Sequence, residues 1–148
     1  MEANLKNLIS KILAHQLEGI MLHFDLMKNY KVMGMDKMAM KHYKHMRDES
    51  ECHAKTVLKV VEKYHEPVAP DSRNRVAIPA VMSEPKDMLD KFTIHTQYLE
   101  AWKHWEEDTV SLYDEIIKAS PDCKMWSMLK SKAEHEINCV KRIMSDLA

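Results

Sequence analysis

Apolar side chains recur at steps of three and four residues over four long stretches of the chain. This spacing is typical of one face of an α-helix, and the β-branched runs of strands are nearly absent. The stretches cover residues 4–33 and 36–64, a third that opens near residue 83, and a fourth that follows residue 120. Their apolar stripes are Leu5, Ile9, Ile12, Ile20, Phe24 and Met27; Met38, Met46, Val57, Val60 and Tyr64; Met88, Phe92, Leu99, Trp102, Tyr113 and Ile116; and Met125, Leu129, Val140, Ile143 and Leu147. The pattern predicts an all-α fold with four long helices.

Capping and helix-breaking residues mark the ends of these stretches. Gly34 is a stop signal for the first helix, and Asp36 is a candidate N-cap for the second. Pro85 suits the first turn of a helix that opens near Ser83. The pair Ser120-Pro121 offers a cap and a first-turn proline for the fourth helix.

The connections between these helices are unequal in length. Only a few residues separate the first helix from the second and the third from the fourth, so each pair must form an antiparallel hairpin. The segment between the hairpins, about residues 66–84, could run the whole length of helices roughly 45 Å long. A slack loop at one end of the bundle is the alternative. We predict one four-helix-bundle domain over residues 1–148, with two antiparallel hairpins joined by one long crossover.

Composition and charge narrow the classes of function. The chain has 148 residues and a formal net charge of −1, with no basic block of the size that nucleic-acid binding requires. Its longest apolar run, residues 76–82, is interrupted by Pro79 and is too short to span a membrane. The cysteines at 52, 123 and 139 form no Cys-x-x-Cys pair, which favours a reducing compartment. We expect a cytoplasmic protein with neither a nucleic-acid nor a membrane partner.

Polar residues interrupt the apolar stripe of each helix near its middle. In chain order they are Gln16; Glu49 and His53; Glu106; and Glu136, with Lys132 one turn before it. Antiparallel pairing places Gln16 level with His53, and Glu106 level with Glu136. A crossover makes the second and third helices parallel, so that His53 lies roughly 18 Å and Glu106 roughly 21 Å from their common end. The interrupting residues are therefore expected to share one layer of the bundle.

Burial of these carboxylates has an energetic consequence. A lone ionised carboxylate in a core costs on the order of several kcal/mol and tends to take up a proton instead. A metal ion, shared protons, or the cations His53 and Lys132 could compensate. A histidine with carboxylates on facing helices is a ligand set that metal sites in helical bundles use. A buried salt-bridge network closed by Lys132 is the alternative to a metal site.

The segment RDESECHAKTVLKVVEKY, residues 47–64, resembles the second-helix segment of the ferritin-like superfamily. The resemblance implies a di-iron site with a Glu from the first helix, Glu-x-x-His from the second, a Glu from the third and Glu-x-x-His from the fourth. His53 and Glu106 match this pattern, and Glu136 stands roughly at the fourth-helix position. Gln16 replaces the first-helix Glu, and Ser50 replaces the second-helix Glu. These departures favour a single-metal or vestigial site over a complete ferroxidase centre.

The site predicted from these arguments binds iron or manganese, the metals that suit an oxygen-rich site with one imidazole. Its ligands are Glu49, His53, Glu106 and Glu136, supported by Gln16, Ser50 and Lys132. No separate catalytic residue is predicted. If the site is redox-active, its reaction would be ferroxidase-like, either oxygen-dependent metal oxidation or removal of peroxide. The alternative is a metal-free bundle with a vestigial site that dimerises or binds a partner. We expect a homodimer or a larger homo-oligomer.

The remaining histidines are assigned to packing or to the surface. Those on apolar stripes but away from the polar layer are predicted to be buried in satisfied contacts: His42 and His95. Those on the flanks of helices are predicted to be exposed: His15, His104 and His135. His45 and Glu49 resemble half of a hemerythrin site, but no other helix carries a second copy of that motif.

Overall fold

The computed structural model describes residues 3–63, 78 and 80–147, and this part of the chain is almost entirely helical. Helix α1 spans Ala3–Val32. The second long helix is continuous and comprises α2 (Asp36–Asp48), the π-helical turn η1 (Glu49–His53) and α3 (Ala54–Lys63). Helix α4 spans Met88–Ala119 and α5 spans Lys124–Leu147. The prediction of an all-helical chain with four long helices is thus confirmed for the described residues.

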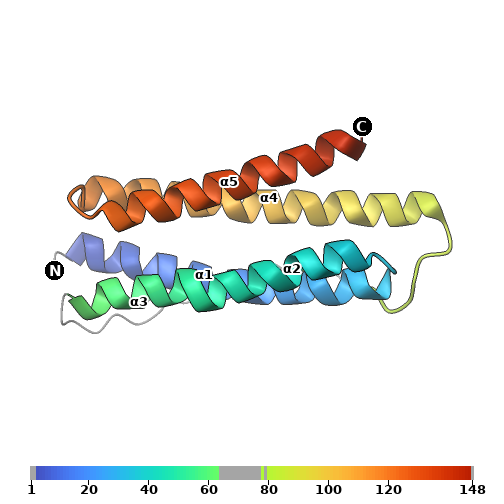
Figure 1. Cartoon of the computed structure of the whole chain (residues 1–148), viewed down its shortest axis with the longest axis horizontal. Helices are drawn as coiled ribbons and strands as arrows, with labels where there is room; N and C mark the ends of the chain where they lie inside the picture. Colours follow the sequence, from blue (N-terminus) through green and yellow to red (C-terminus); the bar gives the residue numbers. More distant parts are fainter. Residues whose placement is uncertain (1–2, 64–77, 79, 148) are drawn as a thin grey trace.

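The helices lie along one common axis as two antiparallel pairs (Figure 1). Helix α1 pairs with the helix formed by α2, η1 and α3, and α4 pairs with α5. Val57 of α3 packs with Leu5 and Leu8 near the start of α1. In contrast, the amide of Val81, shortly before α4, donates a hydrogen bond of 3.3 Å to Asn29 Oδ1 near the end of α1.

The end of α3 and the start of α4 therefore lie at opposite ends of the bundle, and these two helices run in the same direction (Figure 1). Most of the predicted crossover, residues 66–77 and 79, lies outside the described residues. Residues 78 and 80–84 lie at the end of the bundle where α4 begins.

A polar layer divides the apolar core into two clusters. One cluster contains Leu5, Leu8, Ile9, Ile12 and Leu13 of α1 with Val57, Tyr113, Ile116, Trp126 and Leu129. The other contains Leu22, Leu26, Tyr30 and Met33 of α1 with Ala39, Tyr98, Leu99, Trp102, Trp105 and Val140. Residues 14–21 of α1 and 106–112 of α4 lie between the two clusters, and polar side chains are buried there. Gln16, Glu49 and Glu106 are thus buried at mid-bundle, as the interrupted stripes predicted.

The predicted apolar face of α1 departs from the structure at Phe24. Phe24 is 38% exposed, whereas Leu22, His23 and Leu26 are buried. The reason is geometric. A four-residue step turns about 40° beyond a full turn, so a row that takes successive four-residue steps leaves the buried face. The buried row of α1 instead mixes three-residue steps with four-residue steps, so it stays on the core side. Met88 and Phe92 of the third stripe are also exposed, because α4 begins beyond the end of α5 (Figure 1).

The helix ends confirm one prediction and correct three others. Gly34 adopts a φ of 74°, and the Met35 amide donates to Tyr30 O at 2.9 Å, so Gly34 does terminate α1. Asp36 is the first residue of α2 and does not cap it, because its carboxylate pairs with Lys31 Nζ at 3.1 Å. The third helix begins at Met88 rather than near residue 83, with the Asp87 carboxylate accepting from the Leu89 amide at 2.8 Å. The fourth begins at Lys124, because residue 120 ends the preceding helix.

None of the helices in the described part of the chain combines the length and the apolar character needed to cross a bilayer.

Candidate metal centre

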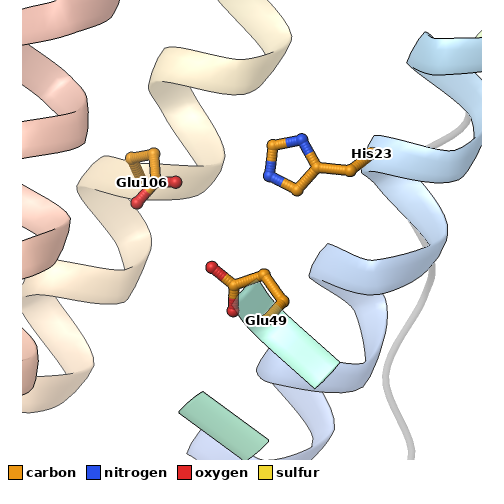
Figure 2. A group of neighbouring side chains, drawn as sticks. All are labelled: His23, Glu49 and Glu106. Carbon is orange, nitrogen blue, oxygen red and sulfur yellow. The ribbon is translucent and has the colours of Figure 1, made fainter. Parts of the chain in front are cut away.

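Three buried side chains from three different helical segments point toward one another in the polar layer (Figure 2). They are His23 of α1, Glu49 at the start of η1 and Glu106 of α4. Each offers one ligand atom, and these atoms all lie within 4.8 Å of one another. The side chains are 0%, 4% and 2% exposed, respectively. The arrangement has the size and the donor types of a small cation site.

Glu49 opens the π-helical turn and points into the core. It follows the buried His42 by seven residues, a step that stays on nearly the same face of a helix. The π-helix widens the turn and shifts the residues after Glu49 around the helix axis. The Ser50 hydroxyl instead donates to the Arg47 carbonyl at 3.0 Å. The carboxylate at 49 thus supplies the charge that is missing at position 50. His53, the last residue of the same turn, lies with its Nδ1 3.0 Å from Glu49 Oε1 and holds this carboxylate in place.

Each of the three side chains has one buried polar atom with no hydrogen-bond partner among the described residues. These atoms are His23 Nε2, Glu49 Oε2 and Glu106 Oε1. Buried polar atoms are paired in the great majority of cases, and an unpaired one needs an explanation such as an ion or a bound proton. Here three such atoms belong to the three residues that converge. The donor set, one imidazole nitrogen and two carboxylate oxygens, fits a divalent transition-metal ion.

The electrostatics of the site favour neutral groups as long as no cation is present. Burial raises the pKa of Glu106 well above its usual range, and the neighbouring charges of Glu49 and Glu136 raise it further. Burial also raises the pKa of Glu49, although the hydrogen bond from His53 opposes this effect. The pKa of His23 is lowered well below its ordinary value, first by burial and then by His42 and other histidines. A neutral imidazole has a free lone pair, so His23 is ready to act as a ligand.

A pocket of about 470 Å³ lies beside Glu49, between the second long helix and α5. Glu49 and His53 line it from one side, and Glu136 lines it from the other. The Glu136 carboxylate lies 3.3 Å from His45 Nε2, and both side chains are partly exposed. Small molecules or ions can therefore approach Glu49 from solvent through this pocket.

The structure brings together two of the four ligands predicted from the sequence. Glu49 and Glu106 converge, and His53 contacts Glu49. Glu136 lies at the pocket, where it pairs with His45. His45 and Glu49 thus contribute to separate contacts rather than to half of a hemerythrin site.

The predicted supporting residues occupy three different environments. Gln16 is fully buried, and its amide donates to the Tyr113 hydroxyl at 2.8 Å. Ser50 is bonded to the backbone of its own helix. Lys132 is exposed at the pocket, so it does not close a buried salt-bridge network among the described residues. The pKa of His53 is raised overall: burial lowers it, but the hydrogen bond and the charge of Glu49 raise it more, and the charge of Lys132 opposes Glu49.

His23 was not predicted from the sequence, and His15 was predicted to be exposed. His23 follows Gln16 by seven residues, a step that keeps a side chain on nearly the same face of a helix, and this signal was available. His15 is 2% exposed rather than exposed, because its ring stacks on Trp105 with centroids 4.5 Å apart. His42 and His95 are buried and His104 and His135 are exposed, as predicted. The expectation of satisfied contacts holds only in part for His42, because its Nδ1 is hydrogen-bonded but its buried Nε2 has no partner among the described residues.

Comparison of the chain with protein-family models, with curated proteins and with solved structures found no match.

The stability of the metal-free protein should pass through a maximum at mildly acidic pH. His23 and His45 have pKa values below the ordinary 6.5, that of His45 being about 4, so their contribution to stability is present above pH 6.5 and is lost as the pH falls. Glu106 has a pKa above the ordinary 4.5, so its contribution is present below that pH and is lost as the pH rises. The free energy of unfolding, measured with urea in the presence of a chelator at a series of pH values from about 4 to about 8.5, checks this expectation. A stability that climbs steadily to the alkaline limit would contradict the assignment of protonated carboxyl groups.

Proposed function

We propose that this protein binds a divalent transition-metal ion, iron or manganese, through His23, Glu49 and Glu106. The observation that carries the proposal is the convergence of three buried side chains whose ligand atoms lie within 4.8 Å of one another. Each of these side chains also has one buried polar atom without a hydrogen-bond partner in the described part of the chain. Two carboxylates and one imidazole form an oxygen-rich set that suits iron and manganese. Protons on the carboxyl groups would leave as the cation enters, because ligands bind in their deprotonated forms.

The surrounding residues have separate tasks in this proposal. His53 orients Glu49, and the hydrogen bond between them fixes the direction of the free oxygen Oε2. Glu136 and His45 lie at the pocket, where they meet ions or small molecules that approach the site. Three protein ligands leave coordination positions open for such molecules. The more specific form of the proposal is oxygen-dependent oxidation of bound iron, with storage as a further possibility.

Membership of the ferritin-like superfamily is part of the same proposal. It is supported by two antiparallel helix pairs, by the common direction of α3 and α4, and by a polar site at mid-bundle (Figure 1). The imidazole ligand from α1 departs from that family's ligand pattern, in which the first helix contributes a Glu.

Metal analysis of the protein purified from cells supplied with iron or manganese tests the proposal. We expect roughly one equivalent of metal per chain, and anomalous scattering from crystals should place it between His23, Glu49 and Glu106. A content below about a tenth of an equivalent, after reconstitution with Fe²⁺ and with Mn²⁺, would overturn the proposal.

A metal-free bundle that associates with a second copy of itself is the second candidate. It is favoured by large apolar side chains that α1 and α2 expose to solvent: Leu17, Met21, Phe24, Met40 and Tyr43. Burial of such side chains in a symmetric interface would be favourable. The metal analysis separates the two candidates, because this one predicts a dimer that contains no metal.

A further inference from the structure

A second buried histidine lies directly behind His23. The Nδ1 atoms of His23 and His42 are 2.9 Å apart, and both side chains are at most 1% exposed. Two nitrogens at this distance form a hydrogen bond only if one carries a proton and the other presents its lone pair. The two rings therefore cannot choose their tautomers independently of each other.

A metal ion at the proposed centre would decide which tautomer His23 adopts. The Nε2 atom of His23 is its unpaired one, so this nitrogen is available to the metal. When Nε2 gives its lone pair to a metal, the proton of the neutral ring must be on Nδ1. That proton then points at His42 Nδ1, which has to act as an acceptor.

The surroundings of His42 keep its ring in the orientation that this hydrogen bond requires. The ring stacks on Tyr30, with centroids 5.4 Å apart and planes inclined by 4°. Trp102 packs against it at 4.8 Å in an edge-to-face geometry. Tyr30 is itself anchored, because its hydroxyl group lies 2.7 Å from His95 Nδ1. His42 is thus immobilised by contacts that are independent of any metal.

We infer that His42 is a positioning residue for the proposed metal centre, and that its Nδ1 accepts the proton of His23 and fixes the ligand tautomer. The inference rests on the proposed function. Hydrogen-bond partners of ligating histidines orient the ring and raise its basicity, and their loss typically weakens metal binding by about 10- to 100-fold. The sequence predicted only a packing role for His42, so a role in positioning a metal ligand goes beyond that prediction.

The test compares two substitutions that differ in acceptor chemistry. His42→Phe keeps an aromatic ring for Tyr30 but removes the acceptor, so Mn²⁺ affinity should fall about 10- to 100-fold. His42→Asn can present an amide oxygen at the place of Nδ1, so its affinity should return to within roughly threefold of the wild type. His104→Phe, which changes an exposed histidine of α4, is the control and should leave Mn²⁺ affinity unchanged.

The possible outcomes are distinct. Wild-type affinity in His42→Phe, or an equal loss in His42→Asn and His42→Phe, would overturn the inference while leaving the metal proposal intact. Absence of Mn²⁺ binding by the wild type would overturn both. Circular dichroism establishes that the variants are folded. If His42→Phe does not fold, His42→Leu takes its place in the comparison with His42→Asn.

Discussion

Glu106→Gln should lose metal binding and yet be more stable than the wild type when both proteins are metal-free. The glutamine has nearly the same shape but cannot ionise, and a neutral amide is a weak ligand for a divalent ion. In the wild type, burial and the charges of Glu49 and Glu136 all disfavour the ionised carboxylate. Removal of this ionisable group should raise the free energy of unfolding at neutral pH by on the order of 1–3 kcal/mol. Urea unfolding with a chelator and metal analysis of the same preparation measure the two effects.

Glu107→Gln is the matched control for this experiment. Glu107 is the next residue of α4 and is exposed, so its substitution should change neither metal content nor stability appreciably. A Glu106→Gln protein that keeps a full equivalent of metal would exclude Glu106 as a ligand. A metal-free variant clearly less stable than the wild type would instead show that this carboxylate takes part in a stabilising network, as the salt-bridge alternative requires.

The depth of the site within the bundle could be predicted from the sequence, but the face of α1 that forms it was only partly predicted. Ile9, Gln16, His23 and Tyr30 follow one another at seven-residue steps, and all four are fully buried. A seven-residue step drifts only about 20° around a helix, whereas repeated four-residue steps drift about 40° each. The prediction followed four-residue steps through Gln16 to Phe24 and so passed over His23. Because α1 packs against neighbouring helices along its length, its buried residues follow the seven-residue repeat, which rotates more slowly around the helix.

The choice of Glu49 over Ser50 as a ligand could be predicted from the apolar stripe of the second helix, although the family resemblance pointed to position 50. The structure places Glu49 in the core. The sequence did not predict the π-helical turn from Glu49 to His53. Such turns arise where tertiary contacts outweigh regular hydrogen bonding, and they are frequent at functional sites. Here those contacts are the hydrogen bond between Glu49 and His53 and the convergence of Glu49 with Glu106.

Gly19→Ala should be the substitution that disturbs both the core and the metal centre without altering a polar group. A Cβ atom at position 19 would overlap Trp105 Cζ2 and lie 2.6 Å from Cη2. Alanine is favoured over glycine within a helix by roughly 0.5–1 kcal/mol, but overpacking of a core costs about 1–3 kcal/mol or more. The clash should therefore prevail, with a net loss of about 1–2 kcal/mol in urea unfolding. The indole ring packs against His23 with centroids 5.9 Å apart, so metal affinity should fall as well.

A double-mutant cycle with Trp105→Phe distinguishes this clash from any other effect of the alanine. The two indole atoms nearest the new Cβ belong to the six-membered ring, and phenylalanine, being shorter, leaves space for the methyl group. Trp105→Phe alone should be destabilising, because it leaves a cavity beside His15 and His23. In its presence, however, Gly19→Ala should cost little or become favourable, so the two changes should be strongly non-additive. If the two effects simply add, Trp105 moves aside from the new methyl group without penalty. The close packing of the indole against His15 and His23 would then not depend on the missing Cβ at Gly19.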